Sequence, residues 1–206
     1  QAADEVLAGQ HEAEFPLVVW QTGSGTQSNM NVNEVLANRA SEILGGERGM
    51  SRRVHPNDEV NLGQSSNDVF PTAMHLAAAA ALQGQVLPSI AVLRTTLAEK
   101  SQRFSGIVKI GRTQLQDAVP MTLEQEFEGF ARTLAADLVS FSRLMSQLGQ
   151  INLGATAIGT GITASPGYAE KCAEHLAKIT GKPIVMSKDL IAATSSQQGF
   201  VIYSSA

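Results

Sequence analysis

Apolar residues recur at intervals of three and four along two long segments of the sequence. Between residues 72 and 104 the repeating positions are Ala78, Leu82, Val86, Ile90, Leu93 and Leu97. Between residues 123 and 148 they are Leu123, Phe127, Phe130, Leu134, Leu138, Phe141, Met145 and Leu148. This spacing places each set on one face of a helix. The pattern therefore predicts two long amphipathic helices, the first with a kink at Pro88.

Local signals predict where helices begin and end. Thr122 and Gln125 have the spacing of a capping box at the start of the second long helix. A shorter helix is expected over residues 166–180, with Ser165 as its N-cap and Gly181 directly after its end. Helices of roughly 30 residues exceed the usual length in compact domains. The sequence thus predicts an all-α fold, an elongated bundle of long helices completed by further helices or subunits, with irregular loops carrying the site.

Composition and charge exclude several classes of protein. The 206 residues contain 15 Lys and Arg against 19 Asp and Glu, a net charge of −4, and these charges are scattered. This argues against a nucleic-acid or membrane-surface partner, and no run approaches the ~20 apolar residues of a membrane span. The single cysteine, Cys172, favours a reducing, cytoplasmic setting. The first residues lack an initiator Met, so we expect a piece of a longer protein.

Three loops are dense in short hydroxyl and amide side chains. They are residues 22–29 (TGSGTQSN), 64–68 (QSSND) and 111–117 (GRTQLQD). Such loops can direct several neutral donors at a carboxylate, although the same residue types are the usual ones in turns and helix caps. The GSGT segment lacks the lysine and the spacing of a phosphate-binding loop, so nucleotide binding is not expected.

The histidines give a second candidate for anion binding. No pair of the four has metal-ligand spacing, so no metal site is predicted. His55 follows Arg52 and Arg53 and precedes the segment Pro56-Asn57-Asp58. A rigid turn with two cations and a titratable imidazole would suit a small carboxylate ligand.

Five motifs follow one another along almost the whole chain. They are WQTGSGTQSNMNVNEVLANRA, VHPNDEVN, QSSNDVFPTAMH, KIGRTQLQDAVPMTLEQEF and INLGATAIGTG. In this order and spacing they closely resemble the class II fumarase and aspartase branch of the fumarate lyase superfamily. Nothing in the 206 residues resembles that family's later G-S-S-x-M-P-x-K-x-N loop, which carries a catalytic serine and a substrate-binding lysine. We therefore expect the isolated chain to be inactive.

The resemblance implies a fold, an assembly and a type of reaction. Residues 1–68 would be the end of an N-terminal domain with substrate-binding loops, and residues 69–206 part of a central helix bundle. Such enzymes are homotetramers with active sites built from three subunits. They remove a C3 proton from a four-carbon dicarboxylate and expel the C2 substituent through an aci-carboxylate carbanion, which neutral donors stabilise. No metal ion or organic cofactor is implied.

The matching motifs also imply site residues. Those expected to bind the substrate are Ser24, Gly25, Thr26, Ser65, Ser66, Asn67 and Thr113. Gln114 stands where class II fumarases carry a histidine that activates water, and Thr113 and Gln114 are the expected catalytic positions. The residues matching an accessory dicarboxylate site are Arg52, His55, Pro56, Asn57 and Asp58.

The motifs are divided between two reactions. TGSGTQSNMN, HPND and QSSND favour a fumarase, whereas TQLQDAVPMTL, INLGATAIGTG and KDLIAAT are similar to aspartases. Glutamine at position 114 cannot titrate, and the loss of an acid or base group there would lower the rate of a hydratase more than that of an ammonia-lyase. We predict a class II fumarate hydratase that forms L-malate. Aspartate ammonia-lyase and a non-catalytic member of the family remain the alternatives.

Overall fold

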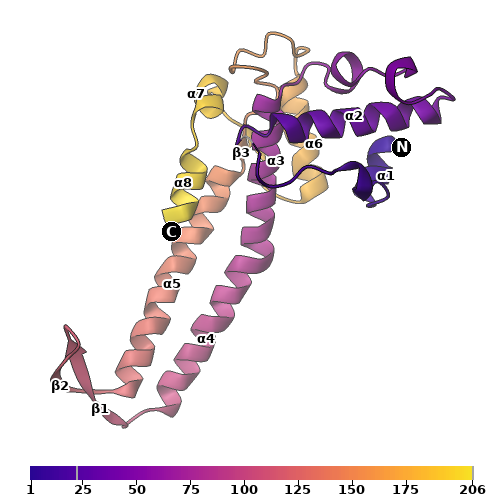
Figure 1. The fold of residues 1–206 in the computed structure, drawn as a ribbon. Coiled ribbons are helices and arrows are strands. Elements are labelled where there is room, and N and C mark those ends of the chain that lie inside the picture. The colour runs from indigo at the N-terminus through magenta and orange to yellow at the C-terminus, as the bar shows by residue number, and fades with distance from the viewer. Residues whose placement is uncertain (22, 206) are drawn as a thin grey trace. The chain divides into compact units, whose positions relative to one another are not determined.

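The computed structural model describes residues 1–21 and 23–205, which fall into two compact units. The first unit contains residues 1–76 and 149–197, and the second contains residues 77–148 and the described residues from 198 onward. Helices dominate both units (Figure 1), which confirms the all-α fold class. The division predicted at residue 68 concerns the domains of the whole protein and stays a prediction.

The second unit is built on two helices that run side by side, α4 (Leu87–Arg103) and α5 (Leu123–Leu148) (Figure 1). Helix α5 has the bounds that its apolar pattern predicts. The Thr122 N–H donates to Gln125 Oε1 at 3.0 Å, and the Gln125 N–H donates to Thr122 Oγ1 at 3.2 Å. These reciprocal bonds confirm the predicted capping box, which satisfies two N–H groups at the start of the helix.

The first predicted long helix consists of three successive helical elements. Helix α3 (Ser66–Ala81) leads into the π-helical turn η4 (Leu82–Val86), which α4 follows. It therefore begins at Ser66 rather than Thr72. Pro88 lies in the first turn of α4, directly after η4, and its ring approaches the carbonyl group four residues earlier, that of Gly84 within η4. The regular α-helix is thus interrupted in η4, over the residues just before Pro88, and the kink at Pro88 stays a prediction.

Small and branched side chains form the core of the second unit. Helix α8 (Gln198–Ser205) packs against α5, and the ring centroids of Tyr203 and Phe141 lie 6.1 Å apart. Near the start of α5, the rings of Phe104 and Phe127 are 5.1 Å apart in an edge-to-face arrangement. The fully or nearly buried residues of this core are Ala79, Leu82, Leu144 and Leu148.

One continuous helical stretch, Ser66–Arg103, is long and apolar enough to cross a membrane by length and composition alone. Its most apolar 18-residue window has a mean hydropathy of 1.6, and 11% of that window is buried. Core helices of water-soluble proteins pass the same test, so this is weak evidence for a membrane span. The expectation of no membrane partner stays a prediction.

Between α4 and α5 the chain forms a β-hairpin that the sequence pattern did not reveal. Strands β1 (Val108–Thr113) and β2 (Gln116–Thr122) pair antiparallel, with an irregularity between Ile110 and Arg112. Thr113 faces Gln116, so the turn consists of Gln114 and Leu115, whose φ angles are 50° and 63°. Both central residues of a type I′ turn require such positive φ values. The usual Asn-Gly signal is absent here, which explains why the hairpin was missed.

The first unit joins N-terminal helices to a C-terminal group of short elements. Its helical elements are α1 (Ala2–Leu7), η1 (Glu12–Glu14), α2 (Thr26–Ile43), η2 (Gly49–Ser51), η3 (Pro56–Val60), the start of α3, α6 (Tyr168–Thr180) and α7 (Leu190–Ser195). The short strands β3 (Gln150–Ile151) and β4 (Val185–Met186) pair in parallel. Ile151, Ala173 and Ile184 form the buried core around them.

The ends of α6 match the prediction only in part. Gly181 follows the helix in a left-handed conformation with φ 63°, as predicted. At the other end Gly167, with φ 75°, takes the N-cap position, so the prediction of Ser165 as N-cap is wrong. A left-handed residue reverses the chain direction without a side-chain cap, and glycine adopts it at low cost.

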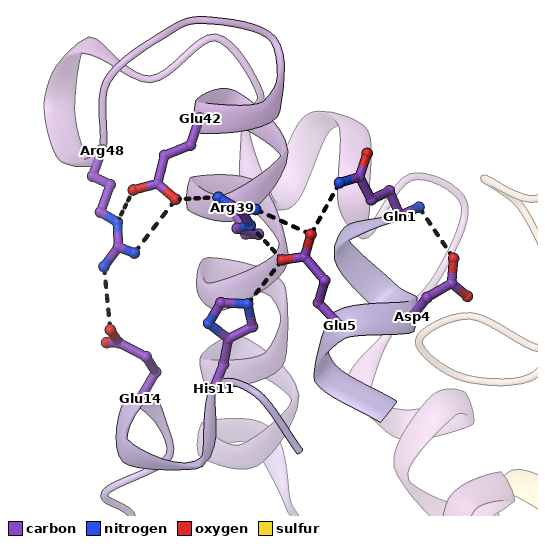
Figure 2. A network of polar contacts seen from close by, with 8 residues as sticks. All are labelled: Gln1, Asp4, Glu5, His11, Glu14, Arg39, Glu42 and Arg48. Carbon is purple, nitrogen blue, oxygen red and sulfur yellow. Dashed lines mark hydrogen bonds and ion pairs between the residues drawn. The ribbon is translucent and has the colours of Figure 1, made fainter. Parts of the chain in front are cut away.

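A chain of ion pairs links α1, η1 and α2 within the first unit (Figure 2). Glu5 lies at its centre, with Oε1 3.0 Å from Arg39 Nη2 and Oε2 3.1 Å from His11 Nε2. These hydrogen bonds, led by that from Arg39, lower the pKa of Glu5 from 4.5 to about 2. The other members drawn in Figure 2 are Gln1, Asp4, Glu14, Glu42 and Arg48.

Replacing Glu5 with glutamine is expected to remove a pH-dependent part of the stability. A carboxyl whose pKa is lowered by folding stabilises the folded state fully above its unfolded pKa of 4.5, and this contribution is lost as the pH falls through about 2. The difference in urea midpoint between wild type and Glu5→Gln should therefore shrink as the pH falls from about 5 to about 2, which is the range that the pKa shift of Glu5 spans. Glu12→Gln, at an exposed position of η1, is the control. A difference that does not vary with pH would contradict the prediction.

Candidate active site

Two of the predicted substrate-binding segments meet where α2 and α3 begin. The hydroxyl oxygens of Ser24 and Thr26 are 3.2 Å apart, and Thr26 Oγ1 is 3.4 Å from Ser66 Oγ. These contacts join segments that lie 40 residues apart in the sequence. The predicted loop 22–29 is a loop only in its first part, because α2 already begins at Thr26, and Thr22 lies outside the described residues.

Gly25 shapes this cluster through its backbone. It has φ 70° and occupies the N-cap position of α2. A Cβ atom at this position would lie 2.2 Å from Cδ1 of the Phe70 ring, far inside van der Waals contact. Glycine is therefore required here both for the left-handed conformation and for the close approach of Phe70. The reversal at Gly25 lets α2 begin with the Thr26 hydroxyl beside Ser66.

The segment from Ser65 to Asn67 is tied to a loop much later in the sequence. Asn67 Nδ2 donates to the carbonyl oxygen of Ala157 at 2.8 Å. In the reverse direction Asn152 Nδ2 donates to the carbonyl oxygen of Asn67 at 3.0 Å and to Thr194 Oγ1 at 3.1 Å. Asn67 is thus fixed through both its side chain and its backbone.

A pocket of about 490 Å³ in the first unit opens beside these residues. Ser24 and Asn67, both predicted to bind the substrate, line it together with residues of α7 and its flanks. The remaining lining residues are Gly23, Phe70, Pro71, Met74, Ala157, Ile158, Ile191, Thr194, Ser195 and Gln197. None of these lining residues carries a formal charge. The pocket therefore offers neutral hydroxyl and amide donors beside apolar walls.

Thr194, Ser195 and Gln197 are pocket residues that the sequence reasoning missed. They belong to the segment ATSSQQ, which is as rich in hydroxyl and amide side chains as the three loops singled out. The same compositional signal could have found it. Asp68 was also passed over, although it stands inside the motif QSSND.

Thr113 and Gln114 belong to the second unit, where both are exposed. Thr113 ends β1 and Gln114 is the first turn residue of the hairpin. The positive φ of Gln114 is uncommon for a residue with a side chain. Their predicted roles in binding and catalysis stay predictions.

His55 stands at the start of the turn that was predicted to bind a second dicarboxylate. Its Nδ1 accepts hydrogen bonds from the N–H groups of Asn57 at 3.3 Å and Asp58 at 3.2 Å, which caps η3. Nδ1 also lies 3.2 Å from Asp58 Oδ2, a contact that a protonated ring would use as donor. In either protonation state Nδ1 is engaged within the turn. Nε2 is therefore the ring nitrogen that could face a ligand.

The other predicted accessory residues have structural contacts of their own. Pro56 is buried as the first residue of η3, which suits a residue without an N–H. Arg52 forms an ion pair with Glu34, and its side chain is 18% exposed. A dicarboxylate at this site would have to compete with Glu34 for the guanidinium group.

The whole chain, residues 1–206, matches a family model described as a lyase. The chain belongs to the fumarate lyase superfamily. It is 59% identical over 200 residues to a fumarate hydratase class II of Ralstonia nicotianae and 58% identical over 201 residues to one of Myxococcus xanthus. These alignments cover 97% and 98% of this chain but 43% of each relative. The resemblance inferred from the motifs is confirmed.

Solved structures of this superfamily have the same fold. A recombinant class II fumarase from Schistosoma mansoni matches with a TM-score of 0.89 at 43% identity, over 99% of this chain and 46% of that one. A fumarate lyase:delta crystallin from Brucella melitensis, bound to cobalt, matches with a TM-score of 0.88 at 45% identity, over 99% and 44%. The present chain thus spans less than half the length of these superfamily members. Among its described residues, no group of three or more His, Cys, Asp and Glu side chains could hold a metal ion.

Proposed function

We propose that the full-length protein is a class II fumarate hydratase, which adds water reversibly to fumarate and forms L-malate. The cluster of Ser24, Thr26 and Ser66 hydroxyls, with Asn67 at the wall of an uncharged pocket, is the observation that carries this proposal. The identity of 54–59% to relatives named fumarate hydratase class II supports it.

These residues suit the charge changes of the reaction. When water adds to C2 of fumarate, negative charge develops on the carboxylate next to C3 as an aci-carboxylate, and C3 then takes a proton. Neutral donors already in place stabilise this charge without having to reorganise. Ser24, Thr26, Ser66 and Asn67 would bind and orient the carboxylate. The proton transfer at C3 requires a group from beyond the motifs present in these residues.

Parallel assays of the full-length protein on two substrates test this function. Fumarate formation from L-malate and from L-aspartate is followed by its ultraviolet absorbance. We expect turnover of malate and none of aspartate, and no turnover of either substrate by the 206-residue chain alone. Turnover of aspartate without malate would contradict the hydratase. Turnover of neither by the full-length protein would favour a non-catalytic member of the family.

The second candidate is aspartate ammonia-lyase, and one observation favours it. Gln114 is exposed at the hairpin turn, in the position where the resemblance implies a histidine in fumarases. Its amide can orient a water molecule or an amine but cannot accept and release the proton of an attacking water. Elimination of ammonia does not require that proton transfer.

We further propose a cytoplasmic homotetramer. Large apolar side chains remain exposed on the paired helices, among them Val92 (67%) and Leu93 (51%) on α4 and Phe130 (53%) and Val139 (52%) on α5. Helices of other subunits would remove this surface from water. Light scattering of the full-length protein measures the assembly directly. The single cysteine, Cys172, supports a reducing compartment.

A further inference from the structure

Asp68 is a carboxylate with no exposed surface in the first turn of α3. Buried aspartates are rare unless their oxygens are fully hydrogen-bonded. Oδ1 of Asp68 accepts the Ser65 N–H at 2.9 Å, the bond of a capping box in which Ser65 is the N-cap. Oδ2 accepts two further N–H groups, those of Gly154 at 3.1 Å and Thr156 at 2.8 Å. Oδ1 therefore binds the start of α3, and Oδ2 binds the later loop that contains Gly154 and Thr156.

The loop that contains Gly154 and Thr156 has a strained backbone, which contacts from outside the loop help to hold. Thr156 has φ 60°, a left-handed conformation that is costly for a β-branched residue. The residue is 3% exposed, and its Oγ1 has no hydrogen-bond partner among the described residues. The loop thus adopts a conformation that Thr156 itself disfavours. The bond from the Thr156 N–H to Asp68 is one of the contacts that hold it there.

The burial of Asp68 also affects the pKa of its carboxyl group. Loss of water raises the pKa of Asp68, while the N–H groups of Ser65, Thr156 and Gly154 act in the opposite direction by stabilising the charged form. Cationic side chains take no part in the hydrogen bonds described for this carboxylate. The backbone dipoles of two loops are thus what its oxygens bind.

We propose that Asp68 is a positioning residue that holds the substrate-binding segment 65–67 against the loop 152–157. The inference rests on the proposed function, because it assigns Asp68 a role through Ser66 and Asn67. Asp68 follows Asn67 directly, and the bonds of Asn67 to Ala157 and Asn152 need the same juxtaposition. Loss of the carboxylate would leave buried N–H groups without an acceptor and separate the two segments.

Asp68→Asn in the full-length protein tests this role, with Asp189→Asn as the matched control. Asp189 accepts the N–H groups of Ile191 and Ala192 through the single oxygen Oδ1, which an amide oxygen can replace. Asp68 uses both oxygens, so an amide must turn its NH₂ group toward either Ser65 N–H or the loop. We expect kcat/KM for L-malate to fall at least about tenfold, and inhibition by succinate to weaken by a similar factor, since displaced donors lose transition-state and carboxylate binding. Asp189→Asn should stay within about twofold.

The outcomes separate positioning from a purely structural role. If Asp68→Asn lowers only the melting temperature, and kcat/KM and succinate inhibition measured well below that temperature are unchanged, the proposal is overturned. If the variant does not fold, amide hydrogen exchange of the wild type decides. If Asp68 positions the two segments, the amides of Ser65, Gly154 and Thr156 are protected from exchange, and they exchange still more slowly when succinate is bound. An unprotected Ser65 amide overturns the proposal.

Failure of the proposed function would be recognised separately. If the wild type converts aspartate but not malate, the same comparison is made with aspartate. If it converts neither, the hydratase proposal has failed and calorimetric binding of succinate becomes the measurement. Weaker succinate binding by Asp68→Asn than by wild type and Asp189→Asn then supports positioning, and equal binding by all three overturns it.

Discussion

Replacing Gln114 with histidine in the full-length protein is expected to raise the conversion of L-malate to fumarate by about 100-fold. A positioned acid or base contributes typically about 10²–10⁴-fold, and glutamine can supply neither function because it does not titrate. Gln114 is the first residue of the hairpin turn and is exposed, so an imidazole can be accommodated there without repacking a core. The measurement is kcat for malate followed through the absorbance of fumarate.

Gln116→His is the matched control for this experiment. Gln116 pairs with Thr113 across the same hairpin, so its replacement adds an identical imidazole two positions away. Only Gln114→His should gain a pH dependence of kcat with an apparent pKa near that of histidine, about 6.5. Turnover of aspartate should not rise in either variant. An unchanged malate rate in Gln114→His would show that position 114 does not limit hydration.

Gly25→Ala is expected to lower the free energy of unfolding by about 3 kcal/mol. The left-handed conformation with φ 70° costs an alanine about 1 kcal/mol. The added Cβ would lie 2.2 Å from the Phe70 ring, and forcing such an overpacked site apart costs about 1–3 kcal/mol more. Urea unfolding of the full-length protein measures the change.

Gly23→Ala distinguishes this effect from a general intolerance of the loop. An added Cβ at Gly23 meets no atom within 4 Å, so a change within about 0.5 kcal/mol is expected there. A loss of equal size in the two variants would mean that the Phe70 contact is not the cause. Because Thr26 follows Gly25, Gly25→Ala should also lower kcat/KM for malate in the protein that remains folded.

The helices with local signals could be predicted from the sequence. The apolar stripe of α5 and its capping box lie entirely within the helix and its flanking residues, so no distant contact was needed to set its bounds. The hairpin could not be found in the same way. Its turn residues, Gln114 and Leu115, have no intrinsic preference for positive φ, so the turn conformation depends on the pairing of the strands around it.

The site was predictable to the extent that it consists of local motifs. Ser24, Thr26 and Ser66 stand in segments that their composition already marks as candidate anion-binding loops, and the structure brings their hydroxyls together. Asp68 could not be assigned a role from composition. Its contacts with Gly154 and Thr156 join residues 86 and 88 positions apart, which only the folded chain reveals.

The hydroxyl cluster lies where two helices begin, α2 at Thr26 and α3 at Ser66. Each helix carries a macrodipole whose partial positive charge is at its N-terminus, and the two ends meet beside a pocket lined by uncharged residues. Fixed backbone dipoles attract an anion without gaining or losing protons. At α2, whose first turn carries no acidic residue, this contribution to carboxylate affinity is expected to be independent of pH, whereas at α3 the buried carboxylate of Asp68 in the first turn offsets part of the helix dipole.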